Sequence, residues 1–128
     1  MFTTIFLLAA AATQPQVTPE ENRLISESIA DLRHKLADPG AAQFRRVHLF
    51  RARGQDGVTR TLLCGQVFID DPRSVQPDTW TMFGAAELST GFFQIVGPMA
   101  TRWCDQPSAE WDYDRDFAAR YAGEIGRR

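Results

Sequence analysis

Hydrophobic residues recur at helical spacing soon after Thr18. Four of them follow one another at intervals of 4, 3 and 4 residues, namely Ile25, Ile29, Leu32 and Leu36. Such a stripe is typical of an amphipathic helix that buries one face. Thr18, Pro19 and Glu21 are residue types with which helices begin, and Pro39 disfavours helical backbone at the residue before it. We therefore predict a helix from Pro19 to about Ala37.

The pattern then changes to that of β-strands. Residues 45–53 and 58–69 flank a Gly-Gln-Asp-Gly turn, and residues 79–88 and 91–96 flank Ser-Thr. Each pair predicts an antiparallel hairpin. In the segment 58–69 hydrophobic residues occupy both faces, which predicts a central strand that is covered on both sides. A single turn at 38–44 joins the first helix to these strands.

A second helix is expected near the end of the chain, from about Ala109 to Ala122, with Ser108 as its cap and Gly123 as its terminator. A proline-containing loop at 70–78 separates the hairpins. These elements predict an α+β fold: an N-terminal helix, an antiparallel sheet of about four strands and a C-terminal helix, with the helices against one sheet face. A chain of 128 residues suits one domain with one core.

The first twelve residues are hydrophobic and carry no charged side chain. The apolar run from Ile5 to Ala12 suits the core of a signal peptide and is too short to span a bilayer. We expect a signal peptide at 1–12 and a mature domain at 13–128, periplasmic or secreted and without a membrane anchor. The first basic residue is Arg23, so the usual basic start is missing. The alternative is a buried N-terminal helix in an unprocessed protein.

Cys64 and Cys104 are the only cysteines of the chain. An even number of cysteines in an exported chain predicts a disulfide, here between these two residues. In the loop-entropy model, closing a loop of about 40 residues stabilises a domain by roughly 4 kcal/mol. The alternative is a thiol nucleophile, which would require His34 or His48 nearby in space.

Charge is segregated along the chain, although the net charge is only −2 and predicts no nucleic-acid partner. One stretch is basic: Arg45, Arg46, Arg51, Arg53 and Arg60. Another is acidic: Asp105, Glu110, Asp112, Asp114 and Asp116. The two stretches either face each other, or are solvated surfaces with weak ion pairs, or the arginines bind an anionic ligand or partner. The candidate binding surface is Arg45, Arg46, Arg51 and Arg53.

The sequence contains no recognisable metal or cofactor motif. HExxH and CxxC are missing, and His34 and His48 belong to no cluster of ligands. The alternating acids at 112–116 resemble a calcium loop, but Phe117 stands where an EF-hand requires Gly and Gly123 where it requires Glu. Nucleotide-binding and catalytic-triad motifs are missing too. We therefore expect no cofactor, no metal site and no catalytic residue.

Two short segments resemble a known pattern. The first comprises Leu36, Asp38, Pro39, Ala41, Ala42, Phe44 and Val47, and the second Cys64, Gly65 and Val67. They are similar to the L-x-DP-x-SA-x-F segment and the CG-x-V strand of small exported proteobacterial proteins of unknown function. Ala41 stands where that family usually has Ser, and residues 68–71 replace its Asn-rich stretch. The resemblance implies export and a small α+β domain, and it implies no activity.

The function expected from these observations is a non-enzymatic binding or structural module of the cell envelope. Its partner would be an envelope protein or an anionic ligand. It would bind through the arginines of the predicted strand at 45–53 or through the loop at 70–78. Two alternatives remain open. One is a small envelope hydrolase or thiol enzyme that uses Cys64 or Cys104 with a histidine, and the other is an inhibitor of a secreted hydrolase.

Overall fold

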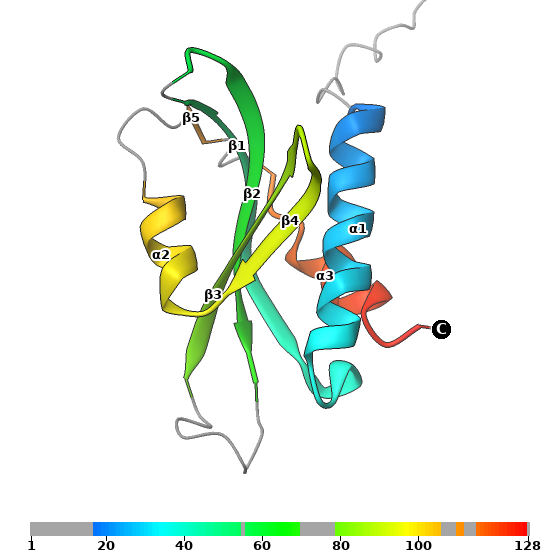
Figure 1. Ribbon diagram of the computed structural model, residues 1–128. Coiled ribbons are helices and arrows are strands. Elements are labelled where there is room, and N and C mark those ends of the chain that lie inside the picture. Colours follow the sequence, from blue (N-terminus) through cyan, green and yellow to red (C-terminus); the bar gives the residue numbers. More distant parts are fainter. Residues whose placement is uncertain (1–16, 55, 70–78, 106–109, 112–114, 128) are drawn as a thin grey trace, which may run out of the picture.

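The computed structural model describes residues 17–54, 56–69, 79–105, 110–111 and 115–127 (Figure 1). The expected signal peptide at 1–12 and the expected loop at 70–78 therefore lie outside the described residues. Within the described residues, an N-terminal helix, an antiparallel sheet and C-terminal helices form an α+β fold, as predicted.

The first helix, α1, spans Pro19–Lys35. It begins as predicted: the Thr18 hydroxyl accepts a hydrogen bond from the Glu21 backbone N–H at 3.1 Å, and the Glu21 carboxylate accepts one from the Thr18 N–H at 3.0 Å. This reciprocal capping satisfies two backbone donors that have no partner inside the helix. The predicted turn that follows is a single 3-10 turn, Pro39–Ala41.

In the part of the chain that the structure describes, the sheet has four long strands and one short one. They are β1 (Gln43–Arg53), β2 (Thr59–Phe68), β3 (Trp80–Leu88), β4 (Gly91–Val96) and β5 (Glu110–Trp111). All pairings are antiparallel, and the order is β4-β3-β2-β1-β5. Both predicted hairpins are thereby confirmed. The strand β2 is central and has buried residues on both faces, as its sequence predicted.

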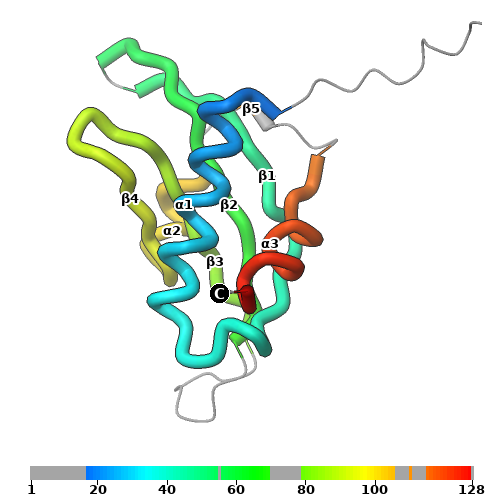
Figure 2. The backbone as a smooth tube through the Cα atoms, turned by 90° about the vertical axis from the view of Figure 1, so that its right-hand side faces the viewer, coloured from blue at the N-terminus to red at the C-terminus, as the bar shows by residue number. Residues whose placement is uncertain are grey.

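The two predicted helices lie on the same sheet face, as expected, but a further helix that the sequence did not predict covers the other face. The helices α1 and α3 (Ala118–Glu124) lie on one face, and α2 (Pro98–Cys104) lies on the other. Figure 2 looks onto the face with α1 and α3, and α2 lies behind the sheet. No amphipathic stripe predicted α2, because the helix has only 7 residues. It starts at Pro98, directly after Gly97, whose φ of 120° favours glycine.

The helix expected at Ala109–Ala122 is shorter and begins later than predicted. Glu110 and Trp111 instead pair with β1 as β5, and α3 begins at Ala118. One cause is Asp116, whose carboxylate accepts hydrogen bonds from the backbone N–H of Val47 at 3.0 Å and of Ala118 at 2.9 Å. The carboxylate thus fixes this segment to β1 and accepts a backbone N–H at the start of α3.

A bulge in β1 changes which residues share a face. The β1–β2 register shifts between Arg45 and His48, and Arg46 has a left-handed φ of 55°. The extra residue reverses the alternation. Consequently Arg45 lies on the α2 face and Val47 on the α1 face, whereas in a strand without a bulge these two residues would share one face. The backbone of Val47 is instead satisfied by Asp116 and by the N–H of Phe117 at 2.8 Å.

Two glycines allow close packing on opposite sheet faces. A Cβ on Gly65 would come within 2.7 Å of the Phe83 ring on the α1 face. A Cβ on Gly84 would come within 2.7 Å of the Trp103 ring and 3.0 Å of the Cys104 sulfur on the α2 face. These positions therefore exclude larger residues for steric reasons.

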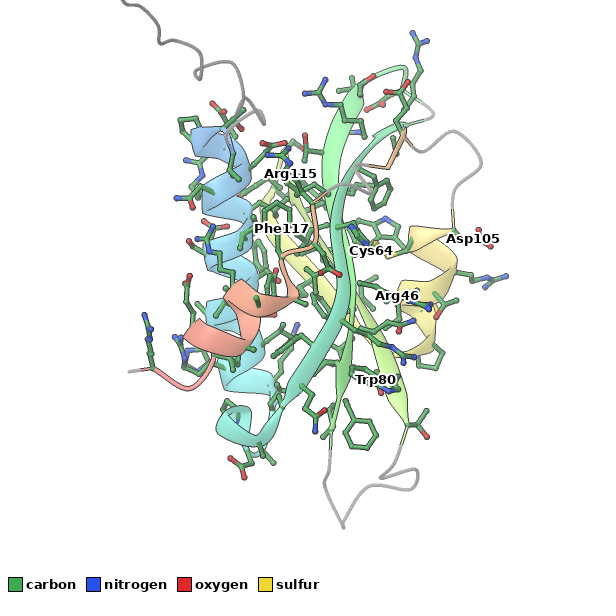
Figure 3. All side chains as sticks on the ribbon, turned by 180° about the vertical axis from the view of Figure 1, so that it is seen from behind. Arg46, Cys64, Trp80, Asp105, Arg115 and Phe117 are labelled. Carbon is green, nitrogen blue, oxygen red and sulfur yellow. A yellow bond between two sulfur atoms is a disulfide. The ribbon has the colours of Figure 1, made fainter. Side chains whose placement is uncertain are left out.

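The predicted disulfide between Cys64 and Cys104 is present, with 6.2 Å between the Cα atoms. Cys64 lies in the middle of β2 and Cys104 is the last residue of α2. Figure 3 shows Cys64 on the side of the sheet that carries α2. The bond therefore fastens α2 onto the face of the sheet.

Candidate functional site

The four arginines of the predicted binding surface form two groups. Arg45 and Arg46 lie on the α2 side, as Figure 3 shows for Arg46. Arg51 and Arg53 alternate with Phe50 and Ala52, which are buried on the α2 face, so their side chains leave the strand on the α1 side. The structure therefore brings the arginines together in pairs and not as one surface.

Arg45 already has contacts within the protein. Its guanidinium carbon lies 4.1 Å from the centre of the Trp80 ring, and its Nε donates a hydrogen bond to the Gln66 side-chain oxygen. The Trp80 ring in turn packs against Phe68 at a centroid distance of 5.4 Å. Cation–π contacts of this kind contribute about 0.5 to 1 kcal/mol at exposed sites. Arg45 thus has a structural role on the α2 face.

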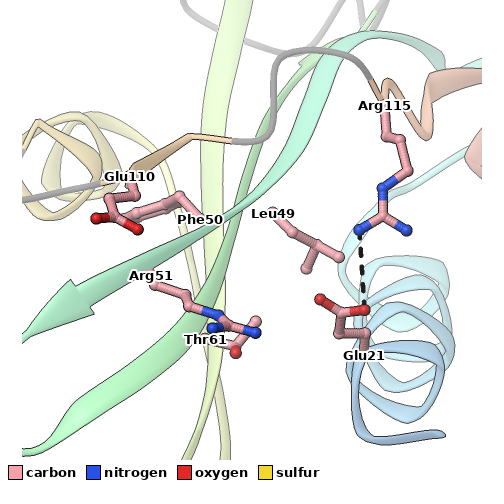
Figure 4. A pocket seen from close by; sticks show the side chains of 7 residues that line it. All are labelled: Glu21, Leu49, Phe50, Arg51, Thr61, Glu110 and Arg115. Atoms are coloured by element: carbon pink, nitrogen blue, oxygen red, sulfur yellow. Dashed lines mark ion pairs between the residues drawn. The ribbon is translucent and has the colours of Figure 1, made fainter. Parts of the chain in front are cut away.

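Arg51 lines a cavity of about 320 Å³, which lies between the start of α1, the outer parts of β1 and β2, and β5 (Figure 4). Leu49 and Phe50 border the cavity but are each only 2% exposed, and Thr61 adds a hydroxyl group. Its other residues are charged: Glu21, Arg51, Glu110 and Arg115. The volume lies at the lower end of the range of about 300 to 1,000 Å³ that is usual for small-molecule sites.

One side of the cavity is formed by Glu21 and Arg115, which interact with each other. The Arg115 Nη2 atom lies 4.0 Å from the Glu21 Oε1 atom, and the side chains are only 17% and 12% exposed. The same Glu21 oxygen accepts the Thr18 N–H in the helix cap. The charges of these two residues are thus partly balanced inside the protein.

The other two charged residues of the cavity, Arg51 and Glu110, are both exposed and are direct partners in the β1–β5 ladder. No ion pair joins them, and neither side chain forms a hydrogen bond or ion pair with another described residue. Figure 4 shows Glu110 on one side of the view, Glu21 and Arg115 on the other, and Arg51 between them. The cavity thus presents one cation and one anion that are available to a ligand.

Two residues of the acidic stretch contact the basic strand β1. Glu110 pairs with Arg51 through the backbone, and Asp116 binds the Val47 N–H through its carboxylate. Asp112 and Asp114 lie outside the described residues, and Asp105 is exposed at the end of α2. Asp116 therefore has a structural role, which accounts for one acid of the apparent calcium loop.

The other residues with potential chemistry have no catalytic arrangement in the described part of the chain. His34 is exposed on α1, and the Nδ1 atom of His48 lies 2.9 Å from the Arg115 carbonyl oxygen. Both cysteines are in the disulfide, so neither has a free thiol. Among the described residues, no group of three or more His, Cys, Asp or Glu side chains is arranged to hold a metal ion.

Two carboxyl groups meet between α1 and β3. A hydrogen bond with Glu87, partial burial and the negative charge of Glu87 raise the pKa of Glu27, and the nearby Arg23 lowers it. Since the hydrogen bond requires a proton on one of the two carboxyl groups, this pair is most favourable at acid pH. Burial raises the pKa of the Tyr121 hydroxyl well above its ordinary value, so Tyr121 stays neutral in the core.

No helix in the described ranges combines the length and the hydropathy that crossing a membrane requires. Comparison of the chain with protein-family models, curated proteins and solved structures finds no match. The resemblance of the 36–47 and 64–67 segments to small exported proteobacterial proteins therefore stays a prediction. Of that pattern, the structure explains Gly65, which has no room for a side chain.

Sequence reasoning identified Arg51 as a candidate but did not place Glu21, Thr61 or Arg115 beside it. Glu21 was assigned only to the helix cap, and Glu110 only to the acidic stretch. No local pattern could have grouped these residues, because they come from α1, β2 and two segments near the end of the chain. The one available signal was that the two stretches carry opposite charges. The stretches do come together in the β1–β5 ladder, where Arg51 is paired with Glu110.

Proposed function

We propose that the protein is an exported, non-enzymatic binding module of the cell envelope, periplasmic or secreted, and that it holds an anionic group of its partner at Arg51. The observation that carries this proposal is the position of Arg51. Of the four candidate arginines it is the one that lines the cavity, and its guanidinium group has no described partner. A guanidinium group suits a carboxylate or phosphate because its N–H donors match two oxygens at once.

Two features support export. The uncharged apolar run at the start of the chain has the composition of a signal-peptide core. The Cys64–Cys104 disulfide is of the kind that persists in oxidising compartments and is rare in the cytosol. The same disulfide supports a binding role over thiol chemistry, because both sulfur atoms are bonded to each other.

A pull-down from native envelope extracts tests the binding role. The Arg51→Ser/Arg53→Ser variant should lose its specific partners, as identified by mass spectrometry. The Arg45→Ser/Arg46→Ser variant changes charge by the same amount on the α2 side and should retain them. Equal capture by both variants and the unchanged protein would contradict a role for Arg51.

Export is tested on protein isolated from its host. We expect its N-terminus to begin near Thr13 and its electrophoretic mobility to change on reduction. A mature chain that still begins at Met1, or one with two alkylatable thiols, would contradict export and the disulfide in the native protein.

A further inference from the structure

The outer edge of β4 is open in the described part of the chain. The strand is the last one in the order β4-β3-β2-β1-β5, and it lies at the other side of the sheet from the cavity with Arg51. Figure 2 shows β4 at the left margin of the sheet. A strand at a sheet edge has backbone N–H and C=O groups without ladder partners, and another strand can bind them.

The register of the β3–β4 hairpin shows which backbone groups face outward. At the end of the ladder, the Gly97 N–H donates a hydrogen bond to the Met82 carbonyl oxygen at 2.9 Å. Hydrogen-bonded and non-hydrogen-bonded pairs alternate along an antiparallel ladder, so every second residue of β4 points its N–H and C=O groups away from β3. These residues are Phe92, Gln94 and Val96.

One of the outward groups is occupied by a charged side chain. The Lys35 Nζ atom donates a hydrogen bond to the Gln94 carbonyl oxygen at 3.0 Å and lies 2.7 Å from the Asp31 carboxylate. The same carboxylate accepts a hydrogen bond from the Gln94 side-chain amide at 2.8 Å. Asp31 therefore holds Lys35 at the middle of the edge. No other described residue binds an outward backbone group of β4.

The strand itself carries no charge that would oppose pairing with another strand. The segment 91–101 contains no Asp, Glu, Lys or Arg. Two large apolar side chains of this segment are exposed, Phe93 at 41% and Met99 at 61%. An uncharged edge strand with exposed apolar side chains is typical of an association site, and a lysine is a common protection of such edges. Here the lysine comes from α1 and not from the strand.

A second copy of this chain suits the edge as its occupant. Two identical strands pair antiparallel about a two-fold axis, so one surface serves both copies. With Gln94 at the axis, Phe92 of one copy lies opposite Val96 of the other, and each outward N–H meets a C=O group. Because the strand is uncharged, this pairing brings no like charges together along β4, although each chain has a net charge of −2.

We infer that β4 is a strand-addition site for a second copy of this chain, and that Lys35 limits this pairing by occupying the Gln94 carbonyl oxygen. A second strand requires that oxygen as an acceptor for its own N–H, and it also meets the ammonium group at the edge. The inference goes beyond the proposed function, since it involves neither the cavity nor Arg51.

Size-exclusion chromatography with light scattering tests the inference on the full-length mature protein over a series of concentrations. Lys35→Ala should dimerise about tenfold or more tightly than the unchanged protein, because the Gln94 carbonyl becomes available to a second strand. The substitution makes the net charge of −2 one unit more negative, so charge repulsion opposes the expected dimer. Lys35→Arg keeps a cationic donor and should behave as the unchanged protein.

Arg53→Ala is the charge-matched control. It removes one positive charge from β1, which two strands separate from β4 only through β2 and β3 in the sheet order. This variant should associate no more tightly than the unchanged protein. Dimerisation of Lys35→Ala and not of Arg53→Ala assigns the effect to the edge of β4.

Amide hydrogen exchange, measured by NMR, locates the interface. In the dimer of Lys35→Ala, the N–H groups of Phe92, Gln94 and Val96 should gain protection, because they bind the second strand. The N–H groups of Phe93 and Ile95 already bind β3 and serve as internal references.

Two further substitutions in the Lys35→Ala protein should restore the monomer. Val96→Pro removes an N–H that points away from β3, so the edge loses a donor while the ladder loses none. Phe93→Lys places a charge on the exposed side chain of the strand. Urea unfolding of each variant at low concentration checks that the fold is retained.

Three results would overturn the inference. The first is a folded Lys35→Ala protein that stays monomeric at every concentration. The second is a dimer in which the amides of Phe92, Gln94 and Val96 gain no protection, since its interface would lie elsewhere. The third is protection of these amides without an increase in mass, which would assign the edge to another occupant than a second copy. None of these results bears on the binding role of Arg51.

Discussion

Among the described residues, the sheet face under α1 and α3 has a hydrophobic core of 13 buried residues, whereas the core under α2 has 6. The helix α1 has 17 residues, and α2 has 7. A helix as short as α2 is not stable by itself in water. The larger face is therefore held by apolar burial, and the smaller face requires an additional constraint, which the disulfide supplies.

The two faces also differ in what they leave for function. The core under α2 consists largely of contacts that fix the helix: the disulfide, Trp103 and the close approach at Gly84. On the other face, residues from the start of α1 and from β1 and β2 line the cavity with Arg51. The candidate binding site thus lies at the edge of the larger core, under α1 and α3, next to well-packed residues.

Of the changes that distinguish the two faces, removal of the disulfide should have the largest effect on stability. The Cys64→Ala/Cys104→Ala variant should lose about 4 kcal/mol of unfolding free energy, because the bond closes a loop with a sequence separation of 40. Urea unfolding measures the loss. Hydrogen exchange should show lost protection in α2 while α1 keeps most of its protection. Equal loss in both helices would show that the two faces do not differ in the way proposed.

The two glycines probe the packing of each face with the same change. Gly65→Ala should cost about 3 kcal/mol, since its Cβ would meet Phe83 and Val47 within the larger core. Gly84→Ala should cost about 1 to 2 kcal/mol, because the new methyl group would chiefly meet the Trp103 ring, which is partly exposed and can shift toward solvent. Thermal or urea unfolding compares them. Gly123→Ala is the control, since no atom lies within 4 Å of the added Cβ, and it should be neutral or slightly stabilising.

Asp116 tests how the segment after β5 is attached to β1. Asp116→Ala should lower the unfolding free energy by about 1 to 2 kcal/mol, because the Val47 and Ala118 N–H groups lose their acceptor. Asp116→Asn keeps one acceptor oxygen and should cost less. Both values come from urea unfolding. An Asn variant as unstable as the Ala variant would show that the charge and not the hydrogen bonds matters here.

The smallest effect on stability is expected from substitution of Glu27, whose carboxyl group lies next to that of Glu87. The hydrogen bond with Glu87 raises the pKa of Glu27 in the folded protein above its ordinary value of 4.5. Its contribution is therefore fully present below that value and is lost as the pH rises through the folded-state pKa. Glu27→Gln should raise stability at neutral pH by a few tenths of a kcal/mol and reduce the pH dependence.

Unfolding curves from pH 4 to pH 8 measure this effect, with Glu20→Gln as a control on the exposed start of α1. Stability that rises with pH for Glu27→Gln relative to the unchanged protein supports the carboxyl pair. The same pH profile in both proteins would contradict it.

The sequence determined the elements whose signals are local. The helix α1 begins at the predicted Pro19 because its cap involves only Thr18 and Glu21. The two hairpins form because their turns and alternating patterns lie in continuous segments. The disulfide could be assigned because the chain has only two cysteines.

The tertiary structure decided what depends on contacts between distant segments. Asp116 and Phe117, distant in sequence, form the hydrogen bonds of Val47 next to the left-handed Arg46, and the bulge there separates Arg45 from Arg51. The position of α2 depends on the space that Gly84 leaves on β3. The cavity depends on residues of α1, β1, β2 and β5 that meet only after folding. Side-chain period and capping act over a few residues, whereas the choice of sheet face and the grouping of charges depend on packing across the whole domain.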